Sequence, residues 1–230
     1  MGKTIVVLGT GTEIGKTYVA AALLEAARAQ GRAVGAAKPL MSGFSPDRME
    51  ESDAGLLAGA AGAAAEKICL YSFEAPLAPN VAARRACVAL DYQRIIAFSR
   101  EAVAGADFAL VEGAGGVLSP LTDEKVNADL ARDLGFPVIL VTADYLGAIS
   151  HTLTALEACA ARGLRVLALA IAQPTPEHGA PSALAEELAR WTPFPAFCFG
   201  QEAPAETRRA AAGLLALIEN ERYEQAAGRQ

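Results

Sequence analysis

The stretch Val7-Leu8-Gly9-Thr10-Gly11-Thr12-Glu13-Ile14-Gly15-Lys16-Thr17 decides the fold, because it joins an apolar run to a long Ala- and Leu-rich segment. A strand, a glycine-rich turn and a helix that opens with Gly-Lys-Thr are the parts of a phosphate-binding loop. The spacing Gly9-x5-Gly15 differs from the general pattern, which would need a glycine where Thr10 stands. Backbone N–H groups of the loop can still wrap a polyphosphate, with Lys16 beside the β- and γ-phosphates and the Thr17 hydroxyl on Mg²⁺. The stretch therefore predicts a site for a nucleoside triphosphate and Mg²⁺.

Short apolar runs alternate with longer amphipathic stretches along the rest of the chain. This alternation predicts an α/β fold, a single-domain parallel sheet flanked by helices of the P-loop NTPase type. Strands are expected at 4–8, 33–37, 108–111, 137–142 and 166–171. Helices are expected at 16–30, 53–61, 78–86, 91–104, 127–134, 147–162, 183–190 and 205–219. We expect one domain over residues 1–222 and a frayed C-terminal tail over 223–230.

Composition narrows the classes of partner. The chain has 230 residues and a formal net charge of −6, so no global positive field attracts nucleic acid or an anionic membrane. No export signal and no apolar stretch of membrane-spanning length is present in the sequence. The four cysteines show no metal-binding spacing, which is typical of free thiols in a reducing compartment. We therefore expect a cytoplasmic protein with neither a nucleic-acid nor a membrane partner.

Two further charged residues stand at the ends of expected strands, and a third heads an expected helix. Glu112 follows the apolar run 108–111 and precedes a second glycine loop, which is where a P-loop enzyme places a carboxylate near its metal. Lys38 follows the strand at 33–37, and Asp53 heads a helix, as an N-cap or as a metal ligand. Ligands of parallel α/β sheets bind outside the carboxyl ends of the strands, where Lys38 and Glu112 stand, and Asp53 would join them as a metal ligand if the loops converge.

Taken together, these segments resemble the dethiobiotin synthetase family. The five-residue spacer of the first loop is that family's own form, and the resemblance runs in order over residues 1 to about 172. The shared stretches are Gly9-Thr10-Gly11-Thr12-Glu13-Ile14-Gly15-Lys16-Thr17, Lys38-Pro39-Leu40-Met41-Ser42-Gly43, Ser52-Asp53-Ala54, Val111-Glu112-Gly113-Ala114-Gly115-Gly116, Pro137-Val138-Ile139-Leu140-Val141 and Leu146-Gly147-Ala148-Ile149.

The resemblance implies a cyclo-ligase that forms carbon–nitrogen bonds in biotin biosynthesis. Its substrates would be 7,8-diaminopelargonic acid, CO₂ and ATP, and its product dethiobiotin, a cyclic urea. An amine captures CO₂ as a carbamate, the carbamate attacks the γ-phosphate to give a carbamic–phosphoric anhydride, and the second amine displaces phosphate. Cations must hold the two anions together, as Lys16 and Lys38 would.

The resemblance also implies roles for individual residues. The catalytic residues would be Lys16, Lys38 and Thr12, and the Mg²⁺ ligands Thr17, Asp53 and Glu112. The nucleotide would contact Glu13, Ile14, Gly15, Lys16, Thr17, Tyr18, Glu112, Gly115 and Gln173. The diamine substrate would contact Lys38, Ser42, Gly147, Ala148, Ile149 and Ser150. In the family the last four come from the partner subunit, which implies a homodimer.

The sequence departs from the family where the base is bound. Ala172-Gln173-Pro174 stands in place of the family's Asn-Asp, and the later base-contacting loop is represented only by Phe199-Gly200-Gln201-Glu202-Ala203-Pro204. The choice of base among ATP, CTP and GTP is therefore open.

Other classes compete with this interpretation. P-loop ATPases that position division sites or plasmids carry an extra lysine where this chain has Gly11. Cobyrinate diamide synthases share the fold but need a fused amidotransferase domain, for which the chain is too short. A non-catalytic nucleotide-binding module would keep Lys16 but dispense with Lys38, Ser42 and Glu112.

Overall fold

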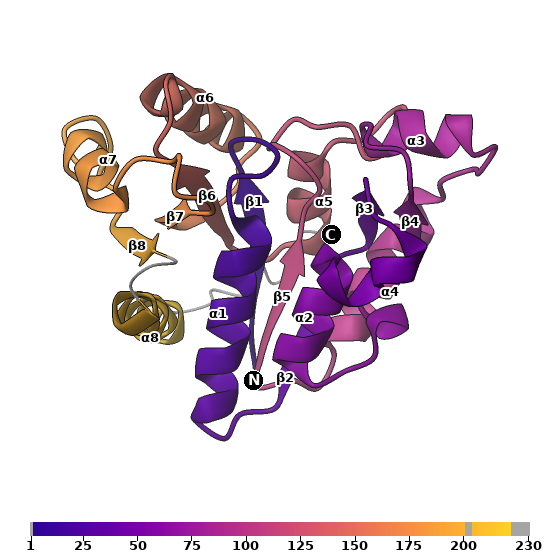
Figure 1. Ribbon diagram of the computed structural model, residues 1–230, viewed down its shortest axis with the longest axis horizontal. Coiled ribbons are helices and arrows are strands. Elements are labelled where there is room, and N and C mark those ends of the chain that lie inside the picture. The colour runs from indigo at the N-terminus through magenta and orange to yellow at the C-terminus, as the bar shows by residue number, and fades with distance from the viewer. Residues whose placement is uncertain (1, 201–203, 222–230) are drawn as a thin grey trace, which may run out of the picture.

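The protein is built on one parallel sheet of six strands in the order β2-β5-β1-β6-β7-β8, shown in the computed structural model of Figure 1, which describes residues 2–200 and 204–221. The strands of this sheet are β1 (Lys3–Gly9), β2 (Val34–Ala37), β5 (Phe108–Glu112), β6 (Val138–Ala143), β7 (Val166–Gln173) and β8 (Ala196–Gly200). β3 (Leu40–Ser42) and β4 (Tyr71–Phe73) form a separate parallel pair. In the main sheet Val7 of β1 is level with Glu112 of β5, and Gly9 is level with Val141 of β6. The register therefore brings the ends of these three strands to one edge.

Helices cover both faces of the sheet (Figure 1). They are α1 (Lys16–Ala29), α2 (Asp53–Ala61), α3 (Pro79–Arg85), α4 (Tyr92–Val103), α5 (Asn127–Leu134), α6 (Ala148–Ala161), α7 (Pro181–Leu188) and α8 (Pro204–Asn220), with 3₁₀ turns η1 (Pro46–Glu51) and η2 (Ala65–Lys67).

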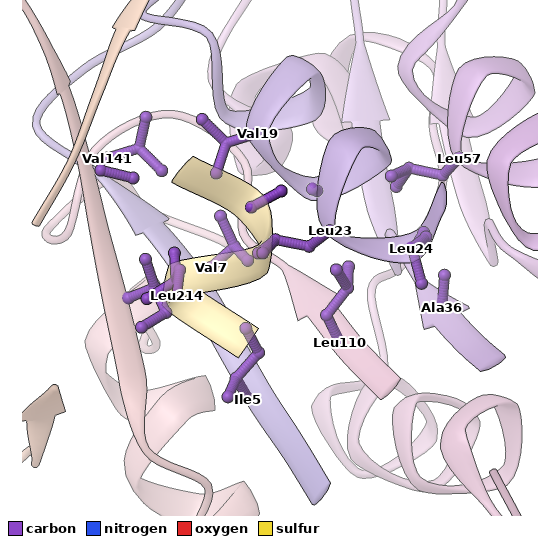
Figure 2. Close-up of a cluster of buried hydrophobic side chains, with 14 of the residues drawn as sticks. Ile5, Val7, Val19, Leu23, Leu24, Ala36, Leu57, Leu110, Val141 and Leu214 are labelled. Carbon is purple, nitrogen blue, oxygen red and sulfur yellow. The ribbon is translucent and has the colours of Figure 1, made fainter. Parts of the chain in front are cut away.

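Alternate residues of β1 feed two separate hydrophobic cores. Ile5 and Val7 pack with α1, α2 and α8, and Figure 2 shows this core around Leu23 and Leu214. Val6 and Leu8 face the other way, toward α4, α5, α6 and α7. Successive side chains of a strand point to opposite faces, so a strand covered on both sides must be apolar throughout. This is why the central strands read as unbroken apolar runs.

The fold class predicted from the sequence is confirmed, and each expected helix and strand has a counterpart. Three strands were not predicted. β3 and β4 have three residues each, and β8 is a partly exposed edge strand that directly follows Pro195. Such short or half-exposed runs lack the apolar continuity that marks a buried strand. The expected tail, 223–230, lies outside the described residues.

Within residues 2–200 and 204–221, no helix has both the length and the apolar character needed to cross a bilayer.

Candidate active site

A cavity of about 890 Å³ opens at the edge of the sheet where β1, β2 and β5 end. Most of the residues singled out from the sequence line it: Thr12, Glu13, Gly15, Lys16, Thr17, Tyr18, Lys38, Ser42, Asp53, Glu112 and Gly115. They come from segments far apart in the sequence, and the sheet register brings them together as expected for a parallel α/β protein.

The first glycine loop is shaped by close contacts. Gly15 has φ of 89°, and a Cβ added to it would lie 2.6 Å from Cβ of Ala172, so only glycine fits there. Glu13 also has positive φ, 58°, which completes the tight turn before α1. Ile14 is buried in the core beneath the loop rather than lining the cavity. One side of the loop is therefore held by the core, and the other side faces the cavity.

Lys16, the first residue of α1, is folded back over this loop. Its Nζ donates to the carbonyl oxygen of Gly11 at 2.7 Å, and the side chain is buried. Burial, and then the nearby positive charge of Lys38, lowers the pKa of Lys16 to about 8. A buried ammonium group with a single carbonyl partner is suited to bind an anion, because a phosphate would supply the missing negative charge.

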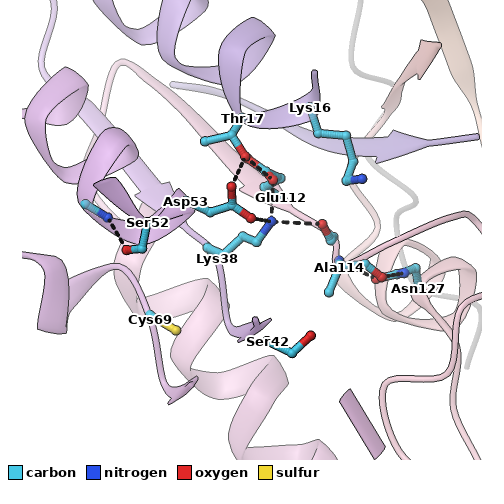
Figure 3. Close-up of polar contacts among 12 residues, drawn as sticks. Lys16, Thr17, Lys38, Ser42, Ser52, Asp53, Cys69, Glu112, Ala114 and Asn127 are labelled. Atoms are coloured by element: carbon cyan, nitrogen blue, oxygen red, sulfur yellow. Dashed lines mark hydrogen bonds and ion pairs between the residues drawn. The ribbon is translucent and has the colours of Figure 1, made fainter. Parts of the chain in front are cut away.

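Thr17, Lys38, Asp53 and Glu112 form a second cluster on the cavity wall, the four-residue cluster of Figure 3. The Thr17 hydroxyl lies 2.8 Å from Asp53 Oδ1 and 2.9 Å from Glu112 Oε1. Lys38 Nζ donates to Glu112 Oε1 and lies 2.7 Å from Asp53 Oδ2. One ammonium group thus bridges two carboxylates beside a hydroxyl.

Burial and charge act against each other in the four-residue cluster. Burial alone would lower the pKa of Lys38, but contact with Glu112 and Asp53 raises it, so Lys38 keeps its proton. Burial opposes the ionised form of Asp53 too, yet Lys38 holds the pKa of that carboxyl below its usual range. Glu112 is fully buried, and burial raises its pKa. These carboxylates are tolerated there because Lys38 is bound between them.

The oxygen atoms of the four-residue cluster fit a hard divalent cation. Glu112 Oε2 is buried and, in the part of the chain that the structure describes, has no hydrogen-bond partner. No group of three or more His, Cys, Asp or Glu side chains gathers among residues 2–200 and 204–221. An ion here would therefore combine one or two carboxylates and a hydroxyl with oxygens of a bound nucleotide, which is the manner in which proteins hold Mg²⁺.

The second glycine loop, residues 113–116, follows β5 and borders the four-residue cluster. The carbonyl oxygen of Gly113 lies 3.5 Å from Lys38 Nζ, and Gly115, with φ of 78°, lines the cavity. Asn127, the first residue of α5, holds this loop through its side chain. Sequence reasoning missed Asn127, because a polar residue at a helix start indicates the start of a helix and nothing more.

The residues expected to contact the diamine substrate, apart from Lys38, divide into two groups. Ser42 lines the cavity, and its hydroxyl donates to the carbonyl oxygen of Leu77 at 2.7 Å. Gly147, Ala148, Ile149 and Ser150 lie at the start of α6 and do not line this cavity.

Two residues expected to contact the nucleotide, Gln173 and Tyr18, are hydrogen-bonded within the chain. Gln173 ends β7 and does not line the cavity, and its Nε2 donates to the carbonyl oxygen of His178 at 3.1 Å. The Tyr18 hydroxyl lies 3.2 Å from the carbonyl oxygen of Gly200. Residues 201–203 of the expected base-contacting loop lie outside the described residues, so the choice of base stays open.

The chain is similar in sequence to known proteins over most of its length. The family model AAA_26, an AAA domain, matches residues 3–203. The chain is 50% identical over 175 residues, 74% of its length and 80% of the relative's, to ATP-dependent dethiobiotin synthetase BioD of Caulobacter vibrioides (strain NA1000 / CB15N). It is 38% identical over 216 residues, 88% of its length and 96% of the relative's, to the protein of the same name from Methylobacterium nodulans (strain LMG 21967 / CNCM I-2342 / ORS 2060).

Solved structures share the fold at much lower identity. Cobyrinic acid a,c-diamide synthase from Mycobacterium smegmatis has a TM-score of 0.53 at 14% identity, over 96% of this chain and 97% of that one. The MinC:MinD cell division protein complex of Aquifex aeolicus gives 0.51 at 12% identity, over 95% and 93%. These classes of protein share the fold, so the fold does not distinguish among their functions. The residues of the site must do so.

Proposed function

The chain belongs to the ATP-dependent dethiobiotin synthetase family, and on that premise we propose that it closes the cyclic urea of dethiobiotin from 7,8-diaminopelargonic acid, CO₂ and ATP. Its activity is that of an ATP-dependent ligase of biotin biosynthesis. One observation carries the detailed proposal: Lys38, which a phosphate-binding loop by itself does not require, faces the same cavity as Lys16.

The two lysines suit a reaction between two anions. A carbamate formed from one substrate amine and CO₂ must approach the γ-phosphate of ATP, and the two repel each other. Lys16 would hold the β- and γ-phosphates, while Lys38, kept protonated by its carboxylate neighbours, would attract the carbamate. Positioning and charge neutralisation supply most of the catalysis of phosphoryl transfer.

The remaining cavity residues fit the later steps. The carbamate oxygen bonds to the γ-phosphorus and ADP leaves, which gives the carbamic–phosphoric anhydride. The second amine then attacks the carbonyl carbon, phosphate leaves and an amine proton is lost. Thr12 and Glu13 of the phosphate loop line the cavity, and so does Ser42, whose hydroxyl would contact the diamine.

We propose that Thr17, Asp53 and Glu112 hold Mg²⁺ together with the nucleotide. Their oxygen atoms and the unpartnered Glu112 Oε2 support this assignment. When bound, the ion would neutralise charge on the β- and γ-phosphates.

We further propose a homodimer that works in the cytoplasm. Gly147, Ala148, Ile149 and Ser150 begin α6, and backbone N–H groups at a helix start suit the distant carboxylate of the substrate. Because these residues do not line the cavity of their own chain, they would serve the cavity of a partner. Leu146, beside them, is fully exposed in the single chain, as an interface residue would be. All four cysteines are free, which suits a reducing compartment.

The test is substrate dependence of ATP turnover. Purified protein is expected to release phosphate from ATP only when diaminopelargonate and bicarbonate are both supplied, and parallel assays with CTP and GTP will define the base. ATP hydrolysis that needs neither compound and is stimulated by lipid or DNA would overturn the proposal in favour of a positioning ATPase.

A further inference from the structure

We propose that Asn127 is a positioning residue for ring closure, because its side chain fixes the second glycine loop, residues 113–116, against the reacting end of the cavity. This inference rests on the proposed function, since it assigns the loop to the reaction that the cavity performs.

All the hydrogen-bonding capacity of the Asn127 amide is directed at this loop (Figure 3). Its Oδ1 accepts the N–H of Ala114 at 3.1 Å, and its Nδ2 donates to the carbonyl oxygens of Ala114 at 2.6 Å and Gly116 at 2.8 Å. The residue is 0% exposed, so no water competes for these bonds. A buried amide with both hydrogens and its oxygen bound holds its partners in one geometry.

Loop and side chain are fitted to each other at contact distance. A Cβ added to Gly113 would lie 2.7 Å from Asn127 Oδ1, so glycine at this position permits the close approach. The backbone of Asn127 is fixed as well, since its N–H donates to the carbonyl oxygen of Ser119 at 3.2 Å and α5 is anchored by the buried Leu130 and Leu134. The rigid start of α5 thus sets the shape of the loop.

This shape leaves one backbone N–H of the loop without a partner among the described residues. The N–H of Ala114 is bound by Asn127, and that of Gly116 by Ser119 Oγ at 2.8 Å. The N–H of Gly115, between them, has no partner within the described residues, and Gly115 lines the cavity. The carbonyl oxygen of Gly113, next to the Asn127-bound residue, lies 3.5 Å from Lys38 Nζ. Asn127 therefore governs the placement of a free donor and of a contact to Lys38.

A fixed N–H donor is useful where negative charge develops during a reaction. Removal of one such donor costs about 10²- to 10³-fold in turnover in other enzymes, and small misplacements cost similar amounts. In the described structure Asn127 forms no hydrogen bond with the phosphate-binding loop, residues 9–17, which would hold the diphosphate of the nucleotide. We therefore expect loss of Asn127 to reduce turnover much more than it weakens the binding of ADP.

The experiment compares Asn127→Leu, which keeps side-chain size without hydrogen bonds, with Asn127→Asp, which keeps the acceptor and loses the donors. We expect kcat for dethiobiotin formation to fall about 10- to 100-fold in Asn127→Leu, with the Kd for ADP within about threefold of the wild-type value. In Asn127→Asp the introduced carboxyl can donate to a loop carbonyl only when protonated. Its kcat relative to wild type is expected to rise as pH falls.

A matched control separates positioning from stability. Asp91→Ala removes the N-cap of α4, whose side chain accepts the N–H groups of Gln93 and Arg94, outside the cavity lining. It should lower Tm by a few degrees and leave kcat unchanged. Should Asn127→Leu fail to fold, Asn127→Ser, which keeps one donor and one acceptor, replaces it in the same comparison.

Three results would overturn the inference. The first is an unchanged kcat in folded Asn127→Leu or Asn127→Ser, and the second is an equal loss of ADP affinity and of kcat. The third is a fall in kcat no larger than that of Asp91→Ala when the two variants have the same Tm. In each of these the wild-type protein still forms the cyclic urea. A wild-type protein that forms none would overturn both this inference and the proposed function, so the two failures are distinguishable.

Discussion

Lys38 Nζ lies 2.7 Å from Asp53 Oδ2, and this ion pair joins the residue after β2 to the first residue of α2. Glu112, at the end of β5, accepts a hydrogen bond from the same ammonium group. The residue proposed to bind substrate is therefore bonded to both carboxylates proposed to bind the metal. A substitution at the substrate-binding lysine therefore also alters the metal ligands, and a substitution at a metal ligand alters the lysine.

Lys16→Ala is expected to impair ATP binding, and Lys38→Ala is expected to impair turnover. Loss of Lys16 removes the charge over the phosphate loop and should weaken ATP binding by about 100-fold, as for a buried charge-assisted contact. Loss of Lys38 should leave the Kd for ATP within about threefold and reduce kcat at least about 100-fold. Calorimetric titration of ATP and an assay of dethiobiotin measure the two effects. Equal losses of nucleotide affinity in both variants would show that Lys38 has been assigned the wrong role.

Lys38→Ala also leaves Asp53 and Glu112 without their ammonium partner. Breaking a buried pair by removing one member costs about 3–5 kcal/mol, so the unfolding free energy of this variant should fall markedly. Urea unfolding measures the loss. The titrations above therefore belong at a temperature where circular dichroism shows the variant fully folded.

Lys16→Met is expected to stabilise the protein without nucleotide at pH 7. The pKa of Lys16 is lowered to about 8 in the folded protein from 10.5, so its charge is unfavourable there. Between pH 8 and 10.5 the unfolded wild-type chain binds a proton that the folded chain releases, and its unfolding free energy rises with pH. The slope is at most about 1.4 kcal/mol per pH unit.

The excess in unfolding free energy of Lys16→Met over the wild type should therefore shrink as pH rises from 8 to 10.5. Urea unfolding of both proteins across this window measures it, and groups common to both cancel in the comparison. An advantage that stays constant over the window would contradict the lowered pKa.

Glu112→Gln is expected to uncouple Mg²⁺ from nucleotide binding. In the wild type the Kd for ATP should be lower with Mg²⁺ than with EDTA. The variant has one ionised ligand fewer, so the ratio of these two Kd values should be about tenfold smaller. Ser42→Ala, in the same cavity but without a role at the metal, is the control and should keep the full Mg²⁺ effect. Equal Mg²⁺ effects in wild type and Glu112→Gln would remove Glu112 from the metal site.

Two inactive variants are expected to rescue each other if the start of α6 serves a partner subunit. Gly147 has φ of 97°, so Gly147→Val strains the start of α6, whereas Lys38→Ala disables the cavity. A random mixture of unfolded and refolded subunits contains half heterodimers, each with one intact site, so about a quarter of wild-type activity should return. A mixture that remains inactive, although native mass spectrometry shows heterodimers, would place both residues in one site of one chain.

Features that depend on local sequence patterns were predictable, and features that depend on contacts between distant residues were not. The doubly covered strands and the phosphate loop were predictable, because burial on both faces and a Gly-Lys-Thr helix start leave local patterns. Lys38 and Glu112 were predictable as neighbours, since each stands at the end of a strand in a parallel sheet, whereas Asp53 heads a helix and its place beside them came from the family resemblance. β8 was missed because an edge strand needs no continuous apolar run.

Asn127 was missed for a different reason. Its partners are the backbone atoms of residues 11 to 13 positions earlier, and no periodicity records such a contact. Gln173 is a related case, because its side chain was expected to face the nucleotide and instead donates to His178. Side-chain orientation depends on packing that a sequence pattern does not contain.

The most direct test of the central claim is mass spectrometry of a reaction containing the purified protein, diaminopelargonate, ATP, Mg²⁺ and ¹³C-labelled bicarbonate. The proposed reaction gives dethiobiotin with the label in its urea carbonyl carbon, one ADP for each ring formed, and no ADP when the diamine is omitted. Release of ADP without any labelled cyclic urea, at the same rate with and without the diamine, would contradict it.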